Sequence, residues 1–139
     1  MIPLVICAQK KTRIDSVQVI RNNILIANIR LLEQIEMDLS LKNRFKIYKT
    51  EDMNTMLELD TKTGIVKQIH WALKSDEEKV YTINPNDLSE STEFGPNVFE
   101  LYSTNNMYQF ILINKINGHK WHIQWGEDKD HRWLRRIKQ

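Results

Sequence analysis

The sequence predicts a single α+β domain over residues 1–139, with an antiparallel sheet of about five strands, N-terminal helical structure and a short C-terminal helix. Three observations lead to this fold class. Apolar residues recur at helical spacing in the N-terminal third, they alternate with polar residues from residue 65 onward, and an Asn-Gly pair separates two alternating runs. A hydrophobic content of 41% is enough to form a core in a chain of this size.

The N-terminal third contains the predicted helix, at Ile24–Leu39, whereas residues 13–23 fit a helix or a strand. The apolar run Ile2–Gln9 and the segment Arg44–Lys49 predict strands, and Thr50–Asp60 predicts a short helix. If the whole segment Arg13–Ser40 is helical, it carries an apolar stripe formed by Ile14, Val17, Ile24, Leu31, Leu32, Ile35 and Leu39.

The second half predicts the sheet. Alternation over residues 64–84 predicts a hairpin around a Ser-Asp-Glu-Glu turn, and Val98–Ser103 and Met107–Ile116 predict further strands after a loop at residues 84–97. We find no internal repeat, low-complexity tract or flexible linker. The hairpin residues expected to face the core are Ile65, Ile69, Trp71 and Leu73.

Asn117-Gly118 predicts a two-residue type I′ turn, which fixes the pairing of the strands beside it. In that register Leu112 pairs with Ile123, and Phe110 pairs with Trp125. The segment Glu127–Lys138 predicts a terminal helix, with acids at its start and bases at its end. The face expected in the core carries Phe110, Leu112, Ile116, Trp121, Ile123 and Trp125.

Charge is distributed unevenly, although the net charge is only +2. Residues 1–50 carry +5, residues 51–101 carry −7 and residues 102–139 carry +4. Such a distribution can be balanced within the fold or can give two faces of opposite sign. The start of the chain lacks the pattern of a signal peptide, and no apolar run is long enough for a membrane span, so we expect a cytoplasmic protein without a membrane partner.

The function that this sequence favours is non-catalytic: a small interaction protein of the inhibitor, immunity or regulatory kind that binds a protein partner. Its acidic loop, with Asp87, Glu90 and Glu93, would dock on a basic surface. The apolar N-terminal segment could also join copies of the chain.

A second hypothesis is a nucleic-acid-binding module, because His131, Arg132, Arg135 and Arg136 combine with Trp133 in the predicted C-terminal helix. The charge of the whole chain argues against it. We therefore rank it below protein recognition.

A small metal-dependent hydrolase or nuclease is the third hypothesis. Its histidines would be His119, His122 and His131, but the strand register places His119 and His122 on opposite faces. The single cysteine, Cys7, excludes an internal disulfide and fits a small apolar residue better than a nucleophile. We therefore expect no catalytic residue, metal or cofactor.

Overall fold

The computed structural model describes residues 3–90 and 95–138, with side chains described from residue 13 onward. The chain forms two compact units, residues 1–39 and residues 40–139. In the described ranges it has one α-helix, two 3-10 helices and eight strands, so the α+β class is confirmed. The predicted single sheet of about five strands is wrong, because the eight strands form two four-stranded sheets.

Helix α1 (Pro3–Arg44) forms most of the first unit. Proline suits the first position of a helix, where its missing N–H is not needed, and Lys42 and Arg44 favour the negative end of the helix dipole. The helix predicted at Ile24–Leu39 is confirmed as part of it, and residues 13–23 are helical as well. The strand predicted at Ile2–Gln9 is wrong from Pro3 onward, because the helix begins there.

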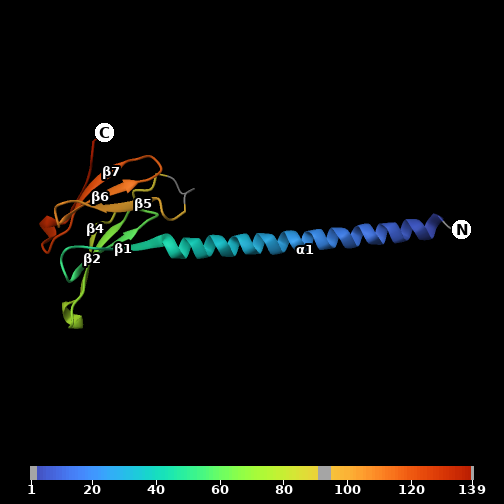
Figure 1. Ribbon diagram of the computed structural model, residues 1–139, viewed down its shortest axis with the longest axis horizontal. Helices are drawn as coiled ribbons and strands as arrows, with labels where there is room; N and C mark the ends of the chain where they lie inside the picture. The colour runs from blue at the N-terminus through green and yellow to red at the C-terminus, as the bar shows by residue number, and fades with distance from the viewer. Residues whose placement is uncertain (1–2, 91–94, 139) are drawn as a thin grey trace. The chain divides into compact units, whose positions relative to one another are not determined.

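The second unit contains two antiparallel meanders, which we call sheet A and sheet B (Figure 1). Strands follow one another in chain order in each sheet, so every connection is a hairpin. Sheet A consists of β1 (Phe45–Lys49), β2 (Thr55–Asp60), β3 (Val66–His70) and β4 (Lys79–Asn84). Sheet B consists of β5 (Phe99–Ser103), β6 (Gln109–Asn114), β7 (Lys120–Gln124) and β8 (Trp133–Arg136).

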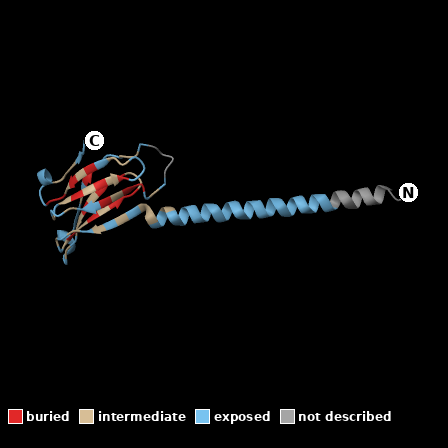
Figure 2. Cartoon of the chain, turned by 45° about the horizontal axis from the view of Figure 1, so that its top comes forward, coloured by how far each residue is buried: buried red, intermediate tan, exposed pale blue. Residues whose placement is uncertain are grey.

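One hydrophobic core lies between the two sheets. Buried residues gather on the strands in Figure 2, and burial alternates along them, as the two-residue period of a strand requires. We call the buried side of each sheet its inner face and the opposite side its outer face. The core residues are Leu57, Leu59, Val66, Ile83, Val98, Phe99, Leu101, Phe110, Leu112, Trp121, Ile123 and Trp125.

Sheet B repeats sheet A at a constant offset of 54 residues, which contradicts the prediction of no internal repeat. Strands β1, β2, β3 and β4 begin at Phe45, Thr55, Val66 and Lys79, and β5, β6, β7 and β8 begin at Phe99, Gln109, Lys120 and Trp133. The identical pairs are Phe45/Phe99, Tyr48/Tyr102, Thr50/Thr104, Met53/Met107, Gly64/Gly118, Ile69/Ile123, Trp71/Trp125, Asp76/Asp130 and Ile83/Ile137.

Local hydrogen bonds repeat with the sequence. The Thr50 hydroxyl donates to the Thr55 carbonyl at 2.8 Å, and its counterpart Thr104 donates to Gln109 at 3.0 Å. After β2 and β6, the next hairpin loops are each closed by a glycine amide that donates over 2.8 Å to the last residue of the preceding strand. The same loop chemistry accompanies the same strand lengths in β1–β3 and β5–β7, whereas β8 is two residues shorter than β4.

The two sheets nevertheless pack back to front. Leu57 and Leu59 of β2 are buried, whereas their equivalents in β6, Ile111 and Ile113, lie on the outer face of sheet B. In β6 the alternate residues Phe110 and Leu112 are buried instead. Equivalent residues thus face opposite ways with respect to the core, so the inner face of sheet A corresponds to the outer face of sheet B.

Two predicted helices are strands in the structure. Thr50–Asp60 forms a turn followed by β2, because Thr50 and Asp52 cap the turn with their side chains. The predicted terminal helix Glu127–Lys138 contains a short 3-10 turn (Lys129–His131) and then β8, which pairs with β7. The strand predicted at Arg44–Lys49 is confirmed as β1, although Arg44 ends helix α1.

The predicted register of β6 and β7 is wrong by two residues. Leu112 pairs with Trp121 and Phe110 with Ile123, because residues 115–118 form a four-residue loop in place of a two-residue turn. A shift of two keeps each side chain on its face. The predicted core face is therefore confirmed for all its members except Ile116, which is about half exposed.

The hairpin predicted at residues 64–84 is confirmed as β3 and β4, but its inward face is not the predicted one. Val66 and Gln68 are buried, whereas Trp71 is exposed and Leu73 extends fully into solvent. Alternation alone does not define which of two partly apolar faces is covered.

Gly64 and Gly118 offer a matched test of the inter-sheet contact. Both have a φ of 75°, but a Cβ on Gly64 would lie 3.1 Å from the Phe99 ring, whereas a Cβ on Gly118 meets nothing within 4 Å. We expect Gly118→Ala to lower the free energy of unfolding by about 1 kcal/mol through backbone strain, and Gly64→Ala by about 1–3 kcal/mol more through overpacking. Urea unfolding at low protein concentration measures the free energy of unfolding of both variants. Equal decreases in the two variants would contradict the contact between Phe99 and Gly64.

Ionisation of Tyr48 should lower the free energy of unfolding at alkaline pH. Burial raises the pKa of its hydroxyl above 10.0, while the repeat-equivalent Tyr102 is exposed and its pKa is raised by the charge of Glu100. A raised folded-state pKa gives stability that is complete below pH 10 and is lost as pH rises through the folded value. The parent chain should lose unfolding free energy between pH 8 and pH 11. We expect Tyr48→Phe to reduce this loss more than Tyr102→Phe does. The reverse order would contradict the burial of the Tyr48 hydroxyl.

Candidate functional site

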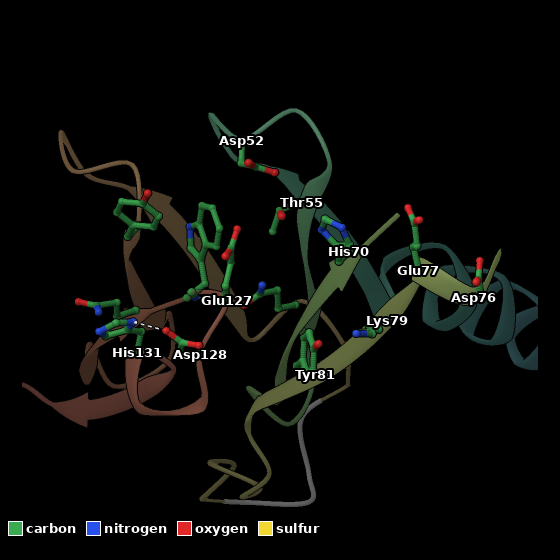
Figure 3. Close-up of a pocket in the computed structure, with 15 residues that line it drawn as sticks. Asp52, Thr55, His70, Asp76, Glu77, Lys79, Tyr81, Glu127, Asp128 and His131 are labelled. Carbon is green, nitrogen blue, oxygen red and sulfur yellow. Dashed lines mark hydrogen bonds and ion pairs between the residues drawn. The ribbon is translucent and has the colours of Figure 1, made fainter. Parts of the chain in front are cut away.

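An open cleft of about 810 Å³ lies between the two sheets, at the end where each 3-10 turn lies (Figure 3). Sheet A contributes its β1–β2 turn, β2, β3, the turn Ser75–Glu77 and β4. Sheet B contributes its β5–β6 turn, the end of β7 with the residues that follow it, and the turn Lys129–His131. The cleft is lined by Asp52, Thr55, Gln68, His70, Asp76, Glu77, Lys79, Tyr81, Tyr108, Gln124, Trp125, Gly126, Glu127, Asp128 and His131.

The bottom of the cleft is held by internal hydrogen bonds and ring packing. Trp125 is buried, its indole N–H donates to the Met107 carbonyl at 2.9 Å, and its ring packs against Tyr108 with 5.0 Å between centroids. The buried Gln68 accepts the Gly126 amide over 3.2 Å, which ties sheet A to sheet B. These partners fix the cleft floor before any ligand binds.

The rim of the cleft is acidic. Among the described residues that line it, the carboxylates Asp52, Asp76, Glu77, Glu127 and Asp128 outnumber the single lysine, Lys79. Asp128 lies 3.6 Å from the His131 ring, and Glu77 lies 3.9 Å from Lys74. Figure 3 shows Glu127, Asp128 and His131 across the opening from the labelled residues of sheet A. Clustered charges of one sign in a concave site attract ligands of the opposite sign.

Arg132 holds the sheet B side of the cleft in place. Its guanidinium donates to the carbonyls of Gly126 at 3.0 Å and Glu127 at 2.6 Å, and it lies 4.1 Å from the centroid of the Tyr81 ring in sheet A. Gly126 is required here, because a Cβ would lie 2.7 Å from that of His131. Arg132 therefore acts within the fold, as a clamp between the sheets.

The other residues of the predicted basic patch lie apart from one another. His131 lines the cleft, Arg135 stacks 3.9 Å from the centroid of the Trp133 ring, and the Arg136 guanidinium lies 3.0 Å from both ring nitrogens of His119. Because β8 is a strand, successive side chains alternate between its faces and do not form one basic stripe.

The predicted acidic loop is tied to the neighbouring hairpin. Asp87 caps the Ser89 amide at 2.8 Å. Glu90 accepts one hydrogen bond from the Asn117 side chain at 2.9 Å and pairs with His119 at 2.8 Å. Glu93 lies outside the described residues. The structure therefore places two members of this predicted site at internal contacts, away from the acidic cleft.

The histidines considered for a metal site are separated. His122 packs edge-on against Trp133, and His119 lies beside Trp121. Within the described residues, no group of three or more His, Cys, Asp and Glu side chains is arranged to hold a metal ion. In the same part of the chain, none of the helices has both the length and the apolar character that crossing a membrane requires.

Most of the residues that line the cleft are not predicted as a site by the sequence. Asp76 and Glu77 were expected only to form a turn, and Glu127 and Asp128 only to begin a helix. The 54-residue repeat relates the turn Ser75–Glu77 to the turn Lys129–His131, and both turns line the cleft. It does not pair the four acids, because Asp76 and Glu77 correspond to Asp130 and His131. Comparison of the chain with protein-family models, with curated proteins and with solved structures found no match in any of the three.

The clamp predicts a stability effect for Arg132. We expect Arg132→Gln to lower the free energy of unfolding by about 1–3 kcal/mol, because two hydrogen bonds and a cation–π contact are lost. Lys129→Gln, in the exposed turn beside it, should change it by less than about 0.5 kcal/mol. Urea denaturation of both variants measures the difference, and an Arg132→Gln variant as stable as the parent would contradict the clamp.

Proposed function

We propose that this chain is a non-catalytic interaction protein and that the cleft between sheets A and B binds a basic segment of a protein partner. The observation that carries the proposal is the set of five carboxylates around an aromatic-lined opening in the described structure. A protein of this kind would act as an inhibitor, immunity or regulatory protein, by covering the partner's basic surface.

The chemistry of the cleft suits arginine and lysine side chains. Carboxylates make charge-assisted hydrogen bonds with a guanidinium, and a bidentate pair adds geometric selectivity. Tyr108 exposes 46% of its surface and can stack on a cation that enters. The bottom of the cleft is already held by the bonds of Trp125 and Gln68, so binding need not order it.

The acidic loop supports this proposal less well than the cleft does. Glu90 already has Asn117 and His119 as partners, and a new cation would compete with them. Nucleic-acid binding is also less well supported, because Arg132 is engaged within the fold and the nearby cleft is acidic.

Binding of a labelled peptide of alternating arginine and glycine tests the proposal by fluorescence anisotropy. We expect Glu77→Gln combined with Glu127→Gln to raise the Kd about tenfold or more, because two charge-assisted contacts are lost. Asp87→Asn combined with Glu90→Gln removes the same charge from the loop and should leave the Kd within about twofold.

Thermal unfolding of both double variants controls for misfolding. Equal loss of affinity in the two double variants would contradict the cleft as the site, and so would the absence of peptide binding by the parent chain. A labelled single-stranded oligonucleotide serves as the competing probe. Tighter binding of the oligonucleotide than of the peptide would overturn the proposal.

A further inference from the structure

The outer face of sheet A carries exposed apolar side chains, and the equivalent residues of sheet B are buried in the core. Phe45 is 56% exposed and Ile47 is 53% exposed, whereas Phe99 and Leu101, their equivalents in sheet B, are 0% and 4% exposed within the core. Val80 is likewise 62% exposed. The outer-face residues Phe45, Ile47, Met56, Ile69 and Val80 correspond to Phe99, Leu101, Phe110, Ile123 and Leu134 of the inter-sheet contact.

The outer face of sheet B carries the equivalents of residues that are buried on the inner face of sheet A. Its residues Ile111 and Ile113 are the equivalents of the buried Leu57 and Leu59. Tyr102 is the equivalent of Tyr48, whose hydroxyl accepts the Leu101 amide across the core at 3.4 Å. Each free face thus corresponds, position by position, to one half of the contact already formed inside the chain.

We propose that the outer face of sheet A of one copy packs on the outer face of sheet B of a second copy, in the same back-to-front manner as the two sheets within one chain. The occupant of both faces is this chain itself. Because the contact joins different surfaces of the two copies, it is heterologous and does not end at a dimer.

Charge complementarity supports this pairing. Within the chain, Arg132 of sheet B lies over Tyr81 of sheet A. The repeat replaces Arg132 by Glu78 and Tyr81 by Arg135, so the same contact between two copies would bring a carboxylate to a guanidinium. Both residues are exposed in the single chain.

Gly64 and Gly118 support the proposed packing of two copies independently of charge. Within the chain the Phe99 ring packs on Gly64, and a Cβ there would lie 3.1 Å from the ring, closer than ordinary van der Waals contact. The equivalents are the exposed Phe45 ring and Gly118, beside which the structure leaves open space. Between two copies, Phe45 would lie on Gly118 as Phe99 lies on Gly64.

The outer face of sheet A differs at its centre from the inner face of sheet B, to which it corresponds. An ion pair of Glu58 and Lys67, 3.3 Å apart, occupies the positions of Leu112 and Trp121. A contact with a polar centre buries less apolar surface, so we expect association that depends on protein concentration and is weaker than the packing within the chain.

Sedimentation velocity of the full chain over a range of concentrations tests the proposal. We expect masses above that of a dimer at high concentration, and a rise of about tenfold or more in the dissociation constant for Glu78→Arg and for Arg135→Glu. An equimolar mixture of the two variants, and the doubly exchanged chain, should recover the parent's association, because opposite charges meet again. Glu51→Arg, in an exposed turn, serves as the matched control and should associate like the parent.

Association through helix α1 is the competing outcome. Ile24→Asp combined with Leu31→Asp places charges on its exposed apolar stripe. If this variant disperses the assembly while the charge reversals at Glu78 and Arg135 do not, the proposal is overturned. A monomeric parent, or an assembly that stops at a dimer, would overturn it as well.

Discussion

The contact of the Phe99 ring with the backbone of Gly64 defines how the two sheets meet. A Cβ on Gly64 would lie only 3.1 Å from this ring, so the ring would have to shift to admit one. The hydrogen bond from the Gly64 amide to the Asp60 carbonyl closes the loop in which Gly64 adopts a positive φ. The remaining core packs around this point, with Leu57 and Leu59 from one sheet and Leu101 and Leu112 from the other.

The cleft is a consequence of the same packing. Repeated turns extend beyond the strands of both sheets at one end, and the back-to-front arrangement brings them together there without covering the space between them. Exposed positions in the first turn carry Asp76 and Glu77, and the residues just before the second turn are the exposed Glu127 and Asp128. Trp125 and Gln68 close the bottom with internal hydrogen bonds, which leaves the carboxylates of the rim as the chemically available groups.

The sequence was sufficient to predict the fold class and which side chains of β6 and β7 are buried, because alternation is strong there. It was insufficient for the register, which depends on a loop stabilised by the Asn114 side chain rather than on the Asn-Gly pair alone. Trp133 and Leu134 fit a helix or a strand equally well, and only pairing with β7 decides between them. The repeat was missed because equivalent positions are buried in one sheet and exposed in the other, so few residues are the same. The cleft joins acids distant in sequence, and only the tertiary packing brings them together.

The most direct test of the account is the nuclear Overhauser contact between the Gly64 α-protons and the ring protons of Phe99 in the isotopically labelled full chain at low concentration. Back-to-front packing predicts a strong contact for Gly64 and none between Phe99 and Gly118, its repeat equivalent. A Phe99 ring that contacts Gly118, or that contacts neither glycine, would contradict the packing on which both the cleft and the assembly depend.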